Sequence, residues 1–246
     1  MKLAGLFCYA TTELLVTRPA TRELRAEWLH RFCARAMKRM GIRVRVVGRY
    51  PERGAVITNH LGYLDIVTLA ALHRCVFVSK AEIQKWPLLG WMTTLSGTVY
   101  VERGRGGSAM RAQSGMQAAA EAGLPVVFFP EGTTSNGETV MKFHSGILAL
   151  AIESGEPVTA GYLRYRLTED NGPGVTVADD VCYWGDTVLA VHVFRLLGLR
   201  GVEVEVRFAD GPIVFSGDVG QRKKAAEEAR AAVMEVGGVV ESVSVR

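Results

Sequence analysis

The sequence lacks the patterns that would assign it to several common classes of protein. Its four cysteines (Cys8, Cys33, Cys75 and Cys182) are scattered over 246 residues without a Cys-x-x-Cys pair. This spacing gives neither a zinc pattern nor a disulfide framework, so we expect no metal site and a reducing, cytoplasmic setting. A Gly-x-Ser-x-Gly run, the nucleophile elbow of many serine hydrolases, is absent. Internal repeats and low-complexity linkers are absent as well.

A long hydrophobic run is also missing. The most apolar stretch near the start, residues 3–16, has 14 residues and includes Glu13, whereas a helix that crosses a bilayer needs about 20 apolar residues. Lys2 followed by an apolar run resembles a signal peptide, but no small-x-small cleavage site follows it. We therefore expect neither a membrane-spanning helix nor export.

Acidic residues are scarce in the first part of the chain. Residues 1–50 contain 11 Lys and Arg against 3 Asp and Glu, while the other 196 residues contain 18 against 22. A basic surface can bind nucleic acid or an anionic membrane, or can simply be the solvated face of a helix packed on the body. The basic residues here alternate with Leu24, Trp28, Leu29, Phe32, Met37 and Met40. This interleaving favours the membrane over nucleic acid.

The first 41 residues have the pattern of a helical hairpin. Residues 3–16 form its first arm, residues 17–20 interrupt it, and Thr21 offers an N-cap for a second helix that runs to Met40 and ends at Gly41. The second arm combines an apolar stripe with about one basic residue per turn, as in helices that lie in a lipid interface. We predict that residues 1–41 form an amphipathic, membrane-associating hairpin and that residues 42–246 form the body.

The body alternates between strand and helix patterns. Strands are expected at 42–47, 55–58, 75–79, 97–103, 125–129, 158–163 and 202–208, and helices at 64–72, 108–122, 143–153, 188–197 and 221–235, with a short helical and turn segment at 81–91. This alternation predicts an α/β fold with a mostly parallel sheet flanked by helices. In such sheets, sites lie beyond the carboxyl ends of the strands.

Polar residues follow three of these expected strands. His60 comes after 55–58, Arg103 closes 97–103, and Glu131 comes after 125–129. Histidine, with an ordinary pKa of about 6.5, can accept a proton from a hydroxyl when a carboxylate fixes its tautomer. Asp65 can do this if His60 lies in the loop and Asp65 in the first helical turn, with Gly62 allowing the bend. A single His-x4-Asp pattern equally describes a loop histidine and a helix-opening acid.

Three ordered segments together resemble one family. The pattern His60-x4-Asp65, the run GTVYVER at 97–103 and the run FPEGTTS at 129–135 resemble the first three motifs of the glycerolipid acyltransferases, of which 1-acylglycerol-3-phosphate acyltransferase is the type enzyme. The resemblance extends over about 28–163, and the preceding hairpin is similar to that of the family. Ala160 stands where the fourth motif usually has proline. Residues 78–82, 86–91 and 131–137 also resemble a bacterial branch that includes lyso-ornithine-lipid acyltransferases.

The resemblance implies an O-acyltransferase that moves a fatty acyl group from acyl-CoA or acyl-carrier protein to the free hydroxyl of a lysolipid, with no further cofactor. It places 1-acylglycerol-3-phosphate first as acceptor, giving phosphatidate, and lyso-ornithine lipid second. It assigns His60 and Asp65 to catalysis, and it assigns Gly97, Arg103, Glu131, Gly132 and Thr133 to substrate binding. It implies a peripheral or monotopic enzyme on the cytoplasmic face of an anionic inner membrane.

Several alternatives remain at this point. A catalytically silent lipid-binding protein would keep the fold and the hairpin, although the intact His60 and Asp65 argue against it. A nucleic-acid-binding module would explain the basic front only. Arg105 in its glycine-rich loop fits either a phosphate site or a turn. Trp86 and Trp91 fit either headgroup anchoring or packing, and His144 fits a structural or peripheral role.

Overall fold

A computed structural model describes the chain except residues 1, 18, 86–88, 102–106, 218–220 and 240–246. The helices are α1 (Lys2–Thr17), α2 (Arg22–Met40), α3 (Tyr63–Leu72), α4 (Leu89–Leu95), α5 (Ser108–Glu121), α6 (Ser145–Glu153), α7 (Val177–Asp180), α8 (Leu189–Gly198) and α9 (Arg222–Gly237), with a 3-10 turn at Ala81–Lys85. The strands are β1 (Arg43–Val47), β2 (Ala55–Ile57), β3 (Val76–Lys80), β4 (Val99–Val101), β5 (Val126–Phe128), β6 (Val158–Leu167) and β7 (Val202–Phe208).

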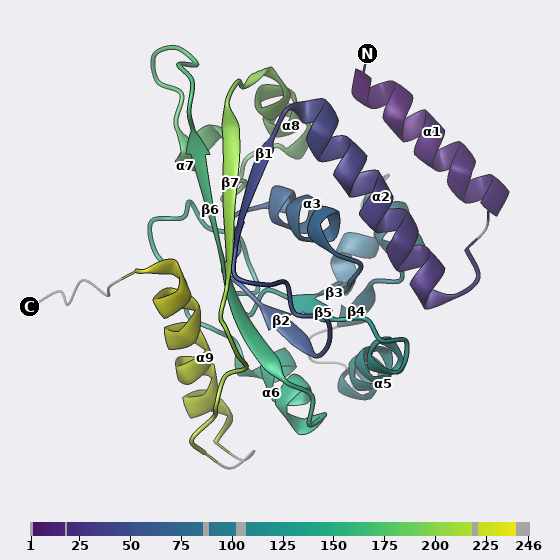
Figure 1. Cartoon of the computed structure of the whole chain (residues 1–246), viewed down its shortest axis with the longest axis vertical. Coiled ribbons are helices and arrows are strands. Elements are labelled where there is room, and N and C mark those ends of the chain that lie inside the picture. Colours follow the sequence, from purple (N-terminus) through teal and green to yellow (C-terminus); the bar gives the residue numbers. More distant parts are fainter. Residues whose placement is uncertain (1, 18, 86–88, 102–106, 218–220, 240–246) are drawn as a thin grey trace, which may run out of the picture.

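These seven strands form one sheet in the order β1-β7-β6-β2-β5-β3-β4 (Figure 1). The pairs from β6 to β4 are parallel, β6 and β7 are antiparallel, and β1 runs parallel to β7 at the edge. The α/β fold with a mostly parallel sheet is therefore confirmed, and so is the edge position of the strand near residue 42.

Helices cover both faces of the sheet. One core cluster joins the sheet to residues of α1, α2, α3 and α8, and the other joins it to residues of α5, α6 and α9. Figure 1 shows α1, α2 and α3 on one side of the sheet and α9 on the other. β2 lies between these layers with Val56 and Ile57 fully buried, so the loop after it starts from the centre of the fold.

The two N-terminal helices form as the sequence predicts. The Thr21 side chain accepts a hydrogen bond from the Leu24 N–H, and α2 ends at Gly41, whose φ of 70° suits glycine. The apolar stripe of α2, however, includes Trp28, Leu29 and Phe32, which are buried in the core that α2 shares with α3. This stripe therefore packs on the body and is not the lipid-facing surface that the sequence analysis assumed.

Several boundaries differ from the expected ones. β6 continues to Leu167, α4 forms a helix from Leu89, and α7 adds a short helix with Thr176 as its N-cap. The N-cap of α5 is Gly107, with a φ of 79°. Among the described residues, none of the helices is both long and apolar enough to cross a membrane.

Candidate active site

The loop after β2 is held in place by an asparagine that the sequence analysis overlooked. The Asn59 side chain accepts a hydrogen bond from the Leu163 N–H (2.8 Å) and donates one to the Leu163 carbonyl (3.0 Å). These two bonds continue the pairing of β2 with β6 through a side chain, beyond the last paired residue, Ile57. They fix the loop at the point where His60 leaves the sheet.

His60 and Asp65 form the expected pair. His60 Nδ1 lies 2.8 Å from Asp65 Oδ2, with His60 in the loop and Asp65 in the first turn of α3. Gly62 is needed here for a different reason from the predicted one. A Cβ at Gly62 would lie 3.0 Å from both the Cβ and the backbone nitrogen of Tyr183, so glycine permits this close approach.

The carboxylate of Asp65 is buried and fully surrounded by donors. Oδ2 also accepts hydrogen bonds from the N–H groups of Leu61 (2.6 Å) and Gly62 (2.9 Å), while Oδ1 accepts one from the Tyr165 hydroxyl (2.7 Å). Burial raises the pKa of Tyr165 well above its usual range, and the charge of Asp65 adds to the shift, so this hydroxyl stays protonated and donates. These bonds compensate the cost of burying the carboxylate.

The arrangement fixes which histidine nitrogen faces outward. A carboxylate can only accept, so Nδ1 of His60 carries the proton that is donated to Asp65, and Nε2 of the neutral ring is left as an acceptor. The ring stacks on Phe129 at a centroid distance of 3.8 Å and an interplanar angle of 8°. Its side chain is 15% exposed, so the imidazole is held rigidly but can still be reached. The pair can therefore take up a proton at Nε2 and stabilise the resulting cation.

Glu131 is brought to the same place because β5 is the neighbour of β2. Its Oε1 accepts a hydrogen bond from the His60 N–H (2.7 Å), and its Oε2 accepts one from the Met141 N–H (3.0 Å). Burial raises the pKa of the Glu131 carboxyl, and these two N–H donors oppose the shift. Both oxygens thus face the backbone, which makes Glu131 a brace between the His60 loop and the segment before α6.

The backbone amides of Gly132 and Ser135 in the third motif are both hydrogen-bonded within the protein. The Gly132 N–H donates to the Phe129 carbonyl (3.0 Å), so this amide already has an acceptor other than a developing oxyanion. Thr133 is exposed. The Ser135 N–H donates to the His60 carbonyl (3.0 Å), which ties the third motif to the first from a second direction.

The described part of the second motif, residues 97–101, is farther from the loop after β2. Gly97 precedes β4, which is separated from β2 by β5 and β3, and its carbonyl accepts a hydrogen bond from Arg22 of α2 (3.1 Å). The structure therefore does not bring Gly97 to the pair. Arg103, Arg105 and Trp86 lie outside the described residues. Trp91 is partly exposed, and His144 is exposed at the start of α6.

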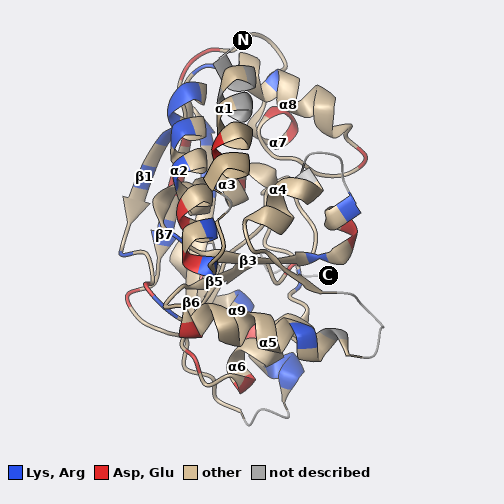
Figure 2. Cartoon of the chain, turned by 90° about the vertical axis from the view of Figure 1, so that its right-hand side faces the viewer, with Lys and Arg blue, Asp and Glu red and all other residues tan. Residues whose placement is uncertain are grey.

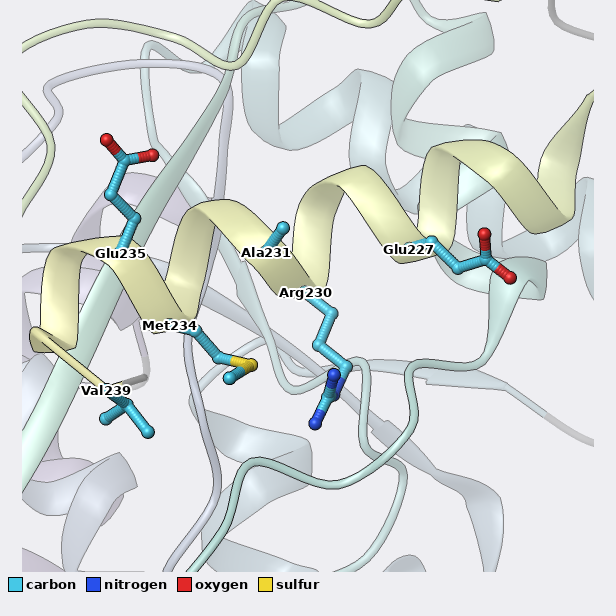
Figure 3. Close-up of a pocket in the computed structure, with 6 residues that line it drawn as sticks. All are labelled: Glu227, Arg230, Ala231, Met234, Glu235 and Val239. Atoms are coloured by element: carbon cyan, nitrogen blue, oxygen red, sulfur yellow. The ribbon is translucent and has the colours of Figure 1, made fainter. Parts of the chain in front are cut away.

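Two hollows in the described part of the surface lie away from His60. One of about 490 Å³ lies beside α9 and is lined by Glu227, Arg230, Ala231, Met234, Glu235 and Val239 (Figure 3). There the Arg230 guanidinium donates to the carbonyls of Val140 (2.8 Å) and Met141 (3.2 Å), next to the amide that Glu131 holds. Arg230 and Glu131 therefore both hold the segment at Val140 and Met141 in place. Among the described residues, we find no group of three His, Cys, Asp or Glu side chains arranged to hold a metal.

A buried carboxylate behind a loop histidine, at the carboxyl end of a strand in a mostly parallel sheet, is an arrangement that can accept a proton from a hydroxyl. Comparison with known proteins identifies the family. A model described as Acyltransferase matches residues 41–163, and the chain belongs to this family.

Two relatives and one solved structure show how the similarity is distributed. The chain is 36% identical to the lyso-ornithine lipid O-acyltransferase of Pseudomonas aeruginosa, covering 74% of this chain and 67% of the relative. It is 28% identical to the 1-acyl-sn-glycerol-3-phosphate acyltransferase of Neisseria gonorrhoeae, covering 65% and 60%. The fold is similar to the crystal structure of a 1-acyl-sn-glycerophosphate acyltransferase from Thermotoga maritima, with a TM-score of 0.60 at 19% identity over 96% and 95% of the chains.

Proposed function

We propose that this lysolipid O-acyltransferase acylates lyso-ornithine lipid and that His60 is its general base. The observation that carries the chemistry is the 2.8 Å contact between His60 Nδ1 and the fully bonded Asp65. The acceptor is proposed because identity and coverage are higher for the lyso-ornithine lipid enzyme than for the 1-acylglycerol-3-phosphate enzyme. This reverses the order of acceptors that the motifs suggested.

In the proposed reaction, Nε2 of His60 removes the proton from the acceptor hydroxyl as its oxygen attacks the thioester carbonyl of the acyl donor. The tetrahedral intermediate then collapses, the carbon–sulfur bond breaks, and the thiol leaves with the proton that His60 held. No acyl-enzyme forms, because the nucleophile belongs to the substrate. Asp65 keeps the imidazole in the correct tautomer and stabilises its cation.

For acceptor binding, Arg103 remains our candidate for the anionic part of the headgroup. The guanidinium of an arginine binds carboxylates and phosphates with two parallel hydrogen bonds. In lyso-ornithine lipid the partner would be the carboxylate of the amino acid. Thr133 stays in the proposed acceptor region because it is exposed beside the His60 loop, whereas the position of Gly97 gives its assignment no support.

The acceptor is tested by comparing two lysolipids directly. Purified protein would be given acyl-CoA or acyl-carrier protein with either lyso-ornithine lipid or lysophosphatidic acid in detergent micelles, and the products measured by mass spectrometry. We expect a higher kcat/KM for lyso-ornithine lipid. A higher value for lysophosphatidic acid would restore phosphatidate synthesis as the function, and transfer to neither would favour the silent lipid-binding alternative.

Glu131 offers a test of positioning against acceptor binding. Glu131→Ala should lower kcat and reduce stability by about 1 kcal/mol for each of the two part-buried N–H groups that it leaves unpaired. Glu131→Gln should fall between this variant and the wild type, because its amide oxygen keeps one of the two acceptors. Steady-state kinetics with varied acceptor measure the effect. If either variant raised the KM for the acceptor at constant kcat, Glu131 would instead bind the headgroup.

We also propose that residues 1–41 contact an anionic membrane. Tyr9, Leu15 and Val16 of α1 are exposed, while Ala10 and Leu14 pack in the core. Since the apolar stripe of α2 is buried, α1 provides the apolar contact and α2 provides the cations. The shared core also means that this hairpin is not separable from the body. The cytoplasmic face of the inner membrane remains our prediction for the location.

A further inference from the structure

One helix outside the N-terminal hairpin has an exposed apolar face. Five large apolar side chains are exposed on α8 and the segment before it: Trp184, Val188, Val191, Phe194 and Leu197. Phe194 is the most exposed, at 82%, followed by Val188 at 63%. Among the exposed residues of α8, only Arg195 is charged. We refer to the five apolar residues as the α8 patch.

The opposite side of α8 is anchored to α3, the helix that carries Asp65. His192 is fully buried, its Nε2 lies 2.9 Å from the Cys182 carbonyl, and its Nδ1 lies 3.0 Å from the Tyr63 hydroxyl. A carbonyl can only accept, so Nε2 donates to Cys182. Burial lowers the pKa of His192, which favours the neutral ring, and Nδ1 of that ring accepts from the Tyr63 hydroxyl. Leu196 is buried beside it. The side of α8 opposite the α8 patch is thus buried, and both ring nitrogens of His192 are hydrogen-bonded there.

The segment that leads into α8 also covers the His60 loop. The Tyr183 N–H donates to the Leu61 carbonyl (2.7 Å), and Tyr183 closely approaches Gly62. Trp184 is the next residue and belongs to the α8 patch. The segment at Tyr183 and Trp184 therefore connects the α8 patch directly to the loop that carries His60.

The position of α8 relative to α1 and α2 fits contact with a single plane. Figures 1 and 2 both show α8 at the same end of the molecule as the N-terminal half of α1 and the C-terminal end of α2. Figure 2 shows basic residues along α2, and Arg31, Lys38 and Arg39 are exposed there. Exposed apolar side chains on α8, with the exposed cations Lys38 and Arg39 of α2 at the same end, suit an anionic lipid interface.

We propose that the α8 patch is a second membrane-contact surface, which inserts into the bilayer that contains the lysolipid acceptor. It would hold the His60 loop at the level of the headgroups, where the free hydroxyl of the acceptor lies. The partner is a lipid surface because the α8 patch is exposed, because only Asp186 and Arg195 are charged in the stretch 184–197, and because the patch adjoins the loop that carries His60 in an enzyme that acts on lysolipids. The inference rests on the proposed function for this last step.

The test is sedimentation with vesicles that contain phosphatidylglycerol. The double variant Val191→Ser/Phe194→Ser should bind at least about tenfold more weakly than wild type, since it removes two apolar side chains from the lipid contact. Val214→Ser is the matched control and should bind like wild type, because Val214 is 89% exposed but belongs to the segment between β7 and α9. Figure 1 shows the described part of this segment running to the lower end of the molecule, away from α8. Both variants change exposed side chains, and circular dichroism would verify their folding.

A second variant gives a readout that does not depend on loss of binding. Phe194→Trp should keep the affinity for vesicles and shift its added fluorescence to shorter wavelength when vesicles are present. Unchanged vesicle binding by the double variant, or no spectral shift, would overturn the proposal. A wild-type dimer in solution that the double variant converts to a monomer would assign the α8 patch to a second copy of the chain instead.

Activity separates this proposal from the proposed function. With the acceptor in detergent micelles, the double variant should retain wild-type turnover, whereas with the acceptor in vesicles its apparent KM should rise. If the wild type transferred no acyl group in micelles, the proposed function would fail while the vesicle-binding result still stood. If the double variant lost turnover in micelles as well, the α8 patch would act on the fold of the site and not on the membrane.

Discussion

Replacing His60 with alanine should lower kcat for acyl transfer by about 10³-fold, within the range of about 10²–10⁴ that a positioned general base contributes. The reason is that His60 is held on three sides: Asp65 at Nδ1, Phe129 against the ring and Glu131 at the backbone N–H. Nε2 is the ring nitrogen that accepts the proton in the proposed reaction. Its loss leaves the acceptor hydroxyl without a base, although the sheet and the sites for both substrates are unchanged.

The measurement is the single-turnover rate of acyl transfer in detergent micelles, with thermal unfolding followed in parallel. His144→Ala is the matched control, because His144 follows the third motif but its side chain is exposed; it should retain wild-type turnover. A turnover of His60→Ala within a few-fold of wild type would exclude His60 as the base. A similar loss in both variants would point to damage around the third motif.

The first motif could be predicted from sequence because its geometry is local. His60 and Asp65 are five residues apart, and the only requirement is that a strand ends before the first and a helix starts near the second. The contact of Glu131 with His60 could not be predicted in the same way, because it depends on β5 lying beside β2. Sequence alternation indicates parallel strands but not their order, and these two residues are 71 positions apart.

For α2, a local sequence pattern predicted a lipid-facing surface that the tertiary structure does not provide. Its apolar stripe and basic residues have the pattern of a helix in a lipid interface, and the same pattern describes a surface helix packed on a protein core. Only tertiary contacts distinguish the two, and they place Trp28 and Phe32 against the body. The exposure of the apolar face of α8 could not be predicted from the sequence, because the pattern of an amphipathic helix does not reveal which of its sides faces the sheet.

Asp65 allows a sharper test, since the bonds around it predict how an amide would sit in its place. In Asp65→Asn, the N–H groups of Leu61 and Gly62 favour an amide oxygen at the position of Oδ2, which leaves the NH₂ group next to the Tyr165 hydroxyl. A hydroxyl can accept as well as donate, so Tyr165 can adapt. The imidazole would then keep its tautomer and lose only its negative partner.

We therefore expect Asp65→Asn to lower kcat by on the order of 10²-fold, equivalent to about 2.7 kcal/mol of transition-state stabilisation, with little change in the KM for the acceptor. Asp65→Ala should lose more, because it also leaves the buried N–H groups of Leu61 and Gly62 unpaired and reduces stability by about 1–3 kcal/mol for each. Tyr165→Phe is the matched control: it removes one donor but leaves the charge, so its kcat should fall less than that of Asp65→Asn. A loss in Asp65→Asn as large as that of His60→Ala would mean that the amide sits the other way and turns the imidazole to the wrong tautomer, whereas an effect confined to KM would remove Asp65 from the chemistry altogether.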